Sequence, residues 1–318
     1  MPRTVSPARR HTARSRRLRL TAAFAVLVAV AGYLTAQYLT GSRGSEQCTV
    51  ESADGSAGGS RTYRLTAEQA ANAATISAVG TTRGMPERAV TIALATAMQE
   101  SGLRNIEHGD RDSLGLFQQR PSQGWGTETQ ILDPVYSAGK FYAHLAEVPG
   151  YSRLPLTVAA QRVQRSGFPQ AYAKHEPDAA LLAAALTGRT PAALNCEPPR
   201  STAGTGRPEK LRTALVRSFG KDVLPAGDAA DGTSGAAGAK ADAALSVPVD
   251  GARRSAKDGA PQHGWELAHW AVAQSEALGI DEVAYAGRRW TSESGWRTER
   301  AKNGTASDSA TVRMRLVR

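Results

Sequence analysis

Apolar residues recur at helical spacing through the middle of this chain and predict a domain built mainly of helices. Thr66 and Gln69 form a capping box, which predicts a helix that begins directly after Thr66. A second helix, ended by Gly102, is predicted by apolar residues spaced as one buried face: Val90, Ala93, Leu94, Ala97 and Met98. Similar patterns predict helices over 129–145, 156–168 and 178–187. We expect the packed domain to span 65–197.

The flanking segments have a different pattern. Residues 41–64 are rich in Gly and Ser, which indicates a flexible spacer. Residues 198–262 hold a short amphipathic stretch followed by a run of Ala, Gly, Asp and Ser, and we interpret them as a flexible linker. Apolar spacing returns in 263–318 as a helix followed by two strands, which predicts a small αβ module.

One apolar run, residues 20–39, is long enough to cross a bilayer core of about 30 Å as a helix. Eight arginines and no lysine or acid precede Glu46, so this segment carries most of the net charge of +10. Basic residues before an apolar span place that side in the cytoplasm. We therefore expect a basic cytoplasmic tail over 1–19, a single transmembrane helix over 20–40 and an extracytoplasmic remainder. A cleaved signal peptide is the alternative.

This distribution of charge also bears on binding partners. The remainder of the chain is close to neutral, which argues against a nucleic-acid partner. The chain has two cysteines, Cys48 and Cys196, without the spacing of a metal site. In an oxidising compartment such a pair predicts one disulfide, which would join the two ends of the packed domain.

Candidate chemistry centres on Glu100, at the end of the second predicted helix. It follows small apolar residues, among which a carboxyl loses solvent and favours its neutral form, as a general acid requires. Gly115 allows a close approach of the backbone, and Gln118 offers both a donor and an acceptor to sugar hydroxyls. Asp110 and Asp112 are candidates for the second carboxylate that a glycoside hydrolase needs. Alternatively, they only cap the turn that follows them.

Two short motifs resemble those of the lytic transglycosylase branch of the lysozyme-like superfamily. Glu100-Ser101 is similar to the ES motif, and Ser113-Leu114-Gly115-Leu116-Phe117-Gln118 is similar to S-x-x-G-L-[MF]-Q with one residue fewer between Ser and Gly. The resemblance covers roughly 65–172. It implies a lysozyme-like fold, with Glu100 as the catalytic acid/base and the Gln118 segment lining the substrate cleft.

The same resemblance implies a cleavage reaction without a second carboxylate. In that family a hydroxyl of the muramic acid attacks, and a 1,6-anhydro end results. Candidate substrate-binding residues are Ser101, Ser113, Gly115, Phe117, Gln118, Trp125, Gln164 and Tyr172. The third family motif, A-Y-N-x-G, is absent: the helix that should carry it reads LTVAAQRVQRSGF, where Gln164 is one polar substitute.

The end of the chain is similar to a carboxypeptidase-like cell-wall module. The final strand of such modules carries a D-H-V-H-V metal motif, and the corresponding segment here, from Asp308 to Met314, has neither histidine. The resemblance therefore implies a module that has lost its metal and its catalysis.

Taken together, the sequence predicts a mainly α (α+β lysozyme-like) domain, an N-terminal transmembrane helix and a small αβ C-terminal module. The predicted activity is cleavage of the MurNAc-GlcNAc bond of peptidoglycan outside the cytoplasm, by lytic transglycosylation. The alternatives are a muramidase, which is a hydrolase, and a non-catalytic wall-binding protein that retains the cleft. We expect peptidoglycan glycan strands as the partner, with no cofactor and no metal.

Overall fold

The computed structural model describes residues 47–52, 61–165, 169–197, 206–224, 244–249, 259–299 and 310–317. All of them belong to one compact unit, residues 45–318. The predicted basic tail (1–19) and membrane helix (20–40) lie outside the described residues. Within the described ranges, no helix is long and apolar enough to cross a bilayer.

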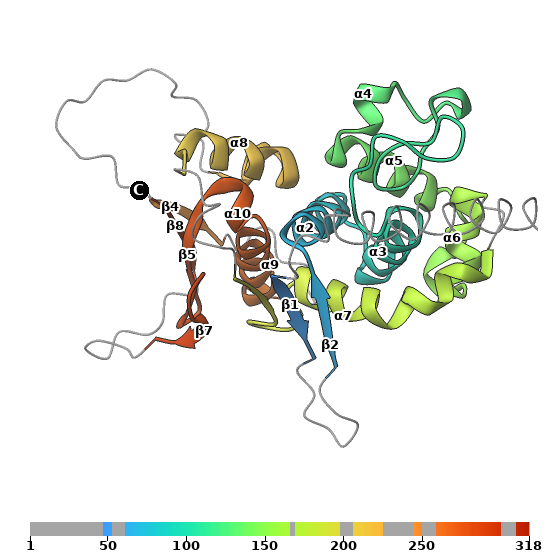
Figure 1. The fold of residues 1–318 in the computed structure, drawn as a ribbon. Coiled ribbons are helices and arrows are strands. Elements are labelled where there is room, and N and C mark those ends of the chain that lie inside the picture. Colours follow the sequence, from blue (N-terminus) through green and yellow to red (C-terminus); the bar gives the residue numbers. More distant parts are fainter. Residues whose placement is uncertain are drawn as a thin grey trace, which may run out of the picture. The chain divides into compact units, whose positions relative to one another are not determined.

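Helices dominate the first part of the described chain (Figure 1). Their bounds are α2 (Ala67–Thr82), α3 (Glu87–Ser101), α4 (Glu128–Ile131), α5 (Pro134–Ala146), α6 (Leu156–Gln164) and α7 (Glu176–Leu186), with short 3-10 helices η1 (Pro121–Gln123), η2 (Tyr151–Arg153) and η3 (Pro169–His175). The predicted capping box at Thr66 and Gln69 begins α2, and Gly102 ends α3 in a left-handed conformation. Helix α3 contacts α2, α5, α6 and α7, and both α2 and α3 are buried over most of their length.

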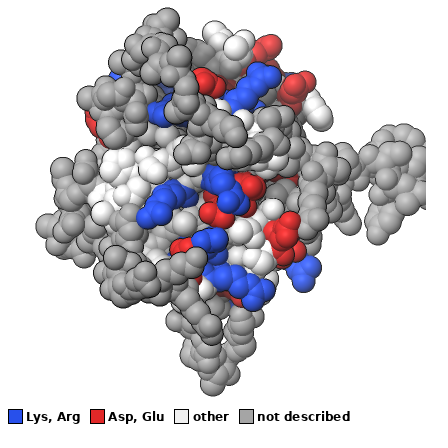
Figure 2. Space-filling view, turned by 90° about the vertical axis from the view of Figure 1, so that its left-hand side faces the viewer, with Lys and Arg blue, Asp and Glu red and all other residues white. Residues whose placement is uncertain are grey.

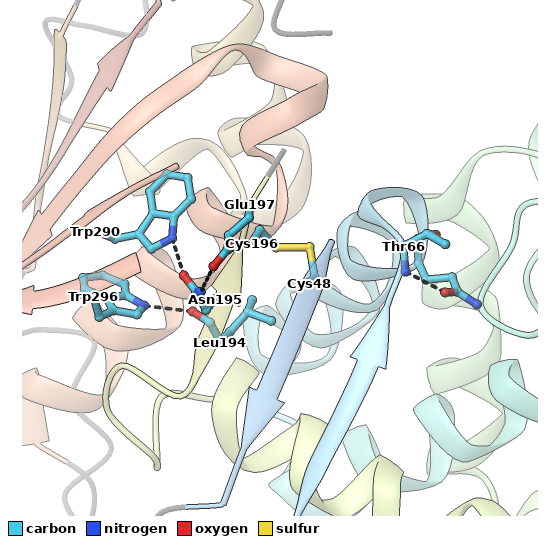
Figure 3. Close-up of a disulfide and its surroundings, with 9 residues drawn as sticks. Cys48, Thr66, Leu194, Asn195, Cys196, Glu197, Trp290 and Trp296 are labelled. Carbon is cyan, nitrogen blue, oxygen red and sulfur yellow. Dashed lines mark hydrogen bonds between the residues drawn. A yellow bond between two sulfur atoms is a disulfide. The ribbon is translucent and has the colours of Figure 1, made fainter. Parts of the chain in front are cut away.

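A three-stranded antiparallel sheet lies beside these helices. Its strands are β1 (Cys48–Glu51), β2 (Thr62–Leu65) and β3 (Leu194–Cys196), in the order β2-β1-β3. Strands β1 and β3 are far apart in sequence, and their register places Cys48 opposite Cys196. The predicted disulfide between these two cysteines is confirmed (Figure 3). It joins the central strand β1 to the edge strand β3.

The last part of the described chain forms a second sheet with helices on it. Helices α8 (Pro208–Phe219), α9 (Gly259–Ala273) and α10 (Ser275–Leu278) and the 3-10 helix η4 (Lys221–Val223) accompany strands β4 (Ala244–Pro248), β5 (Ile280–Tyr285), β6 (Arg288–Thr291), β7 (Gly295–Thr298) and β8 (Thr311–Leu316). The strands are antiparallel in the order β4-β8-β5-β6-β7. Helix α9 packs on β5 and β8, and it also contacts α2, α7, α10 and β3. It therefore connects this sheet to the helical part.

Specific hydrogen bonds reinforce that connection at β3 (Figure 3). The indole Nε1 of Trp290 donates to Asn195 Oδ1 at 2.9 Å, and that of Trp296 donates to the Leu194 carbonyl at 2.8 Å. His269, fully buried on α9, accepts from the Ala193 N–H at 3.2 Å and contacts the Ala185 carbonyl at 2.7 Å through Nδ1. These bonds satisfy polar groups that the packing would otherwise bury without partners.

The second sheet also carries ion pairs. Arg315 pairs with Asp281 and with Glu282, and Arg289 pairs with Glu282 and with Glu299. Figure 2 shows the side of the molecule on which Figure 1 places this sheet, and there the positive and negative side chains of described residues alternate. This mixture does not suit a surface for binding a polyanion.

The predicted fold class is wrong as stated. A mainly α (α+β lysozyme-like) domain followed by a small αβ module does not account for the two antiparallel sheets, one of which begins at Cys48. Strand β1 and all of β2 except Leu65 fall in the predicted spacer 41–64, and α8 and β4 fall in the predicted linker 198–262. The strands of the first sheet have three or four residues each, too few to display an alternating pattern, and β1 pairs with a distant partner.

Candidate functional site

Glu100 lies in a cleft of about 950 Å³, at the upper end of the usual size range for ligand pockets. The cleft lies among the end of α3, the loop that follows it, the end of α5 and the end of α6. Its lining residues are Glu100, Asp110, Arg111, Ser113, Gln118, Gln119, Arg120, Gln123, Gly124, Trp125, His144, Glu147, Val148, Arg162, Val163, Gln164 and Arg165. The lining is predominantly polar, which suits a hydroxyl-rich ligand.

The end of α3 holds Glu100 in place. The helix is buried from Ala89 to Met98, and Glu100 follows in the last turn as a partly exposed residue. The next residue, Ser101, is buried, and its hydroxyl lies 3.1 Å from the Ala97 carbonyl and 2.8 Å from the Leu116 carbonyl. Ser101 therefore joins the helix to the following loop and does not line the cleft.

Tyr172 fixes the carboxyl group itself. Its hydroxyl donates to Glu100 Oε1 at 2.6 Å, although the two residues are 72 positions apart in sequence. Tyr172 is fully buried in η3, so it orients Glu100 without lining the cleft. The nearby His175 contacts Gln99 Oε1 through Nε2 at 3.1 Å, and burial lowers the pKa of this histidine. Its ring therefore favours the neutral form, unlike a surface histidine.

The loop from Gly109 to Gln119 brings Gln118 into the cleft. Leu114 and Gln119 exchange backbone hydrogen bonds of 2.9 and 3.0 Å, and Gly115 turns the chain between them with φ of 73°. A Cβ on Gly115 would lie 2.8 Å from the Ile131 carbonyl, so a larger residue would displace the backbone. Gln118 has φ of 48°, which is uncommon outside glycine, and it donates to the Gly115 carbonyl at 3.2 Å.

Packing beneath the loop makes it rigid. Phe117 is fully buried and stacks on Phe141 of α5 with ring centroids 4.7 Å apart. Gln164, at the end of α6, donates to the Phe117 carbonyl at 2.7 Å and also lines the cleft. The loop is therefore held by two helices that are distant from it in sequence.

The structure separates the two candidate second carboxylates. Asp110 is exposed and lines the cleft. Asp112 does not line it: its Oδ1 pairs with Arg120 Nε at 2.7 Å, and its Oδ2 accepts from the Ser122 N–H at 2.8 Å. Hydrogen bonds from Ser122, followed by that from Arg120, hold the pKa of Asp112 well below its usual range. Asp112 thus acts as a structural anion that closes the turn, as in the alternative interpretation of the sequence.

The other predicted site residues lie as follows. Ser113 is buried and lines the cleft, and Trp125 lines it with its ring 4.4 Å from that of His144. Gly115 and Phe117 shape the loop from behind. The motifs did not indicate the cleft arginines Arg111, Arg162 and Arg165. The available signal was the position of Arg162 and Arg165 on either side of Gln164, in the segment where the third motif was expected.

A metal site is not found in the part of the chain that the structure describes, where no group of three or more His, Cys, Asp or Glu side chains is placed to hold an ion.

Comparison with known families finds a match in the C-terminal part of the chain. Residues 207–311 match the family model described as VldE, C-terminal domain. This stretch begins just before α8 and ends at the first residue of β8, so it includes neither Glu100 nor any other residue of the cleft. No curated protein matches the chain. The resemblances to a lytic transglycosylase and to a carboxypeptidase-like module therefore stay predictions.

Proposed function

We propose that the cleft binds glycan strands of peptidoglycan and that Glu100 cleaves the MurNAc-GlcNAc bond as the general acid/base of a lytic transglycosylase. The observation that carries the proposal is the hydrogen bond from the buried Tyr172 hydroxyl to Glu100 Oε1. It holds the orientation of a carboxyl group that lines the cleft, and positioning of an acid is a large part of its catalytic effect. The disulfide supports a location in an oxidising, extracytoplasmic compartment.

The reaction needs one carboxyl group. Glu100 donates its proton to the glycosidic oxygen, and the bond between that oxygen and C1 of the MurNAc breaks. The C6 hydroxyl of the same MurNAc then attacks C1 and returns a proton to the Glu100 carboxylate. A 1,6-anhydro ring forms, no water is consumed, and Glu100 ends in its initial state. Gln118 and Gln164 at the cleft wall supply hydrogen bonds that suit sugar hydroxyl and acetamido groups.

A muramidase is the second candidate, and the position of Asp110 favours it. This carboxylate lines the same cleft as Glu100, so it is available to activate a water or to attack C1. Asp112 is not proposed for that role because both of its oxygens are occupied by Arg120 and Ser122.

The test is mass spectrometry of fragments released from purified peptidoglycan by the wild type, Glu100→Gln and Asp110→Asn. We expect the wild type and Asp110→Asn to release fragments with anhydro ends, and Glu100→Gln to lower the release by about 100-fold or more, as is usual for loss of a general acid. Glu100→Gln keeps the size and hydrogen-bonding capacity of the side chain, and Glu107→Gln serves as the matched control, because Glu107 is exposed and lies outside the cleft lining.

The products distinguish the candidates. Reducing ends that depend on both Glu100 and Asp110 would identify a hydrolase. Retained binding without fragments from any of the proteins would mean that the cleft only recognises the wall, and the proposed activity would be wrong.

A further inference from the structure

Three arginines of the cleft have no ion-pair partner among the described residues. Arg111, Arg162 and Arg165 are exposed and line the cleft, and none of them forms an ion pair with another residue in the described ranges. Arg120, the fourth cleft arginine, is instead held by Asp112 at 2.7 Å. Arginine presents a fixed fork of donors that matches carboxylate and phosphate groups, so unpaired arginines in a cleft suit an anionic ligand.

The backbone at two of these arginines adds an independent observation. Arg111 has φ of 57° and Arg165 has φ of 52°, in the left-handed region that glycine or asparagine normally occupies. Arg165 stands at the C-terminal cap of α6, where glycine is the usual residue. Unfavourable backbone conformations of this kind concentrate at functional sites. Both positions therefore keep a long cationic side chain where local structure favours another residue.

The acidic residues of the cleft do not form ion pairs with these arginines. They are Glu100, Asp110 and Glu147. Glu100 accepts from Tyr172, and Glu147 has His144 as its nearest basic partner at 3.9 Å. When Glu100 carries the proton that it donates in the proposed reaction, two carboxylates remain beside the three unpaired arginines. The cleft is then cationic, with Arg162 and Arg165 on one helix end.

We infer that this cleft selects glycan strands that carry free carboxylates, with Arg162 and Arg165 at the end of α6 as the recognition residues and Arg111 as a further contact. The inference rests on the proposed function and narrows its substrate class. It also accounts for the missing third motif: the helix expected to carry neutral substrate contacts carries two arginines on either side of Gln164.

Binding to two matched glycans tests the inference. We would use the full chain with Glu100→Gln, which prevents turnover, and measure calorimetric affinity for a GlcNAc-MurNAc hexasaccharide with peptide stems bearing free α-carboxylates. The comparison ligand is the same hexasaccharide with carboxamides in their place. We expect the carboxylate form to bind about tenfold more tightly, as expected for two partly exposed, charge-assisted contacts. Addition of salt should weaken only that preference.

Substitution of the arginines shows whether they cause the preference for the carboxylate form. Arg162→Gln together with Arg165→Asn should make the two hexasaccharides bind equally, and asparagine tolerates the left-handed backbone at residue 165. Arg153→Gln is the matched control, because Arg153 is also exposed and lies outside the cleft lining. Thermal unfolding of each variant verifies that the fold is kept.

The outcomes separate this inference from the proposed function. Equal binding of the two hexasaccharides, or an unchanged preference in the double variant, would overturn it even if Glu100-dependent cleavage is observed. Displacement of the carboxylate form by a glycerol phosphate polymer at lower concentration than by a carboxylated competitor would also overturn it, because phosphate would then be the preferred anion. Absence of cleavage with a carboxylate preference that depends on Arg162 and Arg165 would overturn only the activity.

Discussion

Substitution of Tyr172 tests whether its hydrogen bond to Glu100 positions the carboxyl group for catalysis. Tyr172→Phe removes the hydroxyl that donates to Glu100 Oε1 and keeps the buried ring. Loss of a hydrogen bond to a charged group costs about 1.5–3 kcal/mol, so kcat should fall by roughly 10- to 100-fold. KM should stay the same, since Tyr172 does not line the cleft.

Steady-state kinetics on soluble glycan strands would measure the effects on kcat and KM separately. Tyr142→Phe is the control, because it removes a buried hydroxyl that donates to the Ile76 carbonyl and not to Glu100. An unchanged kcat in Tyr172→Phe, or a rise of KM alone, would contradict the positioning role.

Local sequence predicts some of these residues and not others. Glu100 and Gln118 lie in short motifs whose order is visible in the chain, and both line the cleft. Tyr172 comes to Glu100 from a 3-10 helix, a contact that depends on tertiary packing and leaves no local pattern. Asp110 and Asp112 are two residues apart and have similar sequence surroundings, and only the contacts to Arg120 and Ser122 distinguish them.

At the level of elements, α9 provides a pH-dependent contact through His269. Burial lowers the pKa of His269 from 6.5 to about 4, and the Ala185 carbonyl opposes that shift only in part. The unfolded chain therefore takes up the proton first as pH falls. The stability that the neutral ring contributes is complete above pH 6.5 and is lost as pH falls toward 4, by about 3 kcal/mol in all.

Denaturant unfolding between pH 4 and pH 7 would measure that dependence. In His269→Gln we expect lower stability at pH 7 and a smaller slope between pH 6.5 and 4 than in the wild type. His108→Gln, a change of an exposed histidine, should leave the slope unchanged. An equal slope in His269→Gln and the wild type would show that other groups cause the dependence.

Helices were more predictable than strands because their signals are local. The cap at Thr66 and the stop at Gly102 each follow from two or three neighbouring residues. By contrast, β1 and β2 are four-residue strands that border a Gly- and Ser-rich stretch, and β4 lies next to a similar one. Their pairing partners, and not their own residues, make them strands.

For the whole molecule, the disulfide is the clearest determinant of stability. It closes a loop with a sequence separation of 148 residues, for which the chain-entropy account gives a contribution of about 5 kcal/mol. Replacing both cysteines, Cys48→Ser and Cys196→Ser, should therefore lower the melting temperature markedly without reductant. Differential scanning calorimetry with and without reductant would measure it. The wild type in reductant is the control, and equal melting of variant and oxidised wild type would refute the prediction.

The sequence did not predict that α9 connects the two sheets. Residues 263–318 were expected as a small separate module, because their pattern is that of a helix followed by two strands. Their buried faces instead pack on α2, α7 and β3, and bonds such as Trp290 to Asn195 have partners about a hundred residues away. No local pattern encodes which distant surface an amphipathic helix will cover.

Strand β3 is held from both of its sides. Cys196 is joined to Cys48 on one side, and Leu194 and Asn195 accept from Trp296 and Trp290 on the other (Figure 3). Because the disulfide ties β3 to β1, a shift of β3 by one residue would move both acceptors away from the two indoles. The cross-link that closes the first sheet therefore also sets the position at which the second sheet attaches.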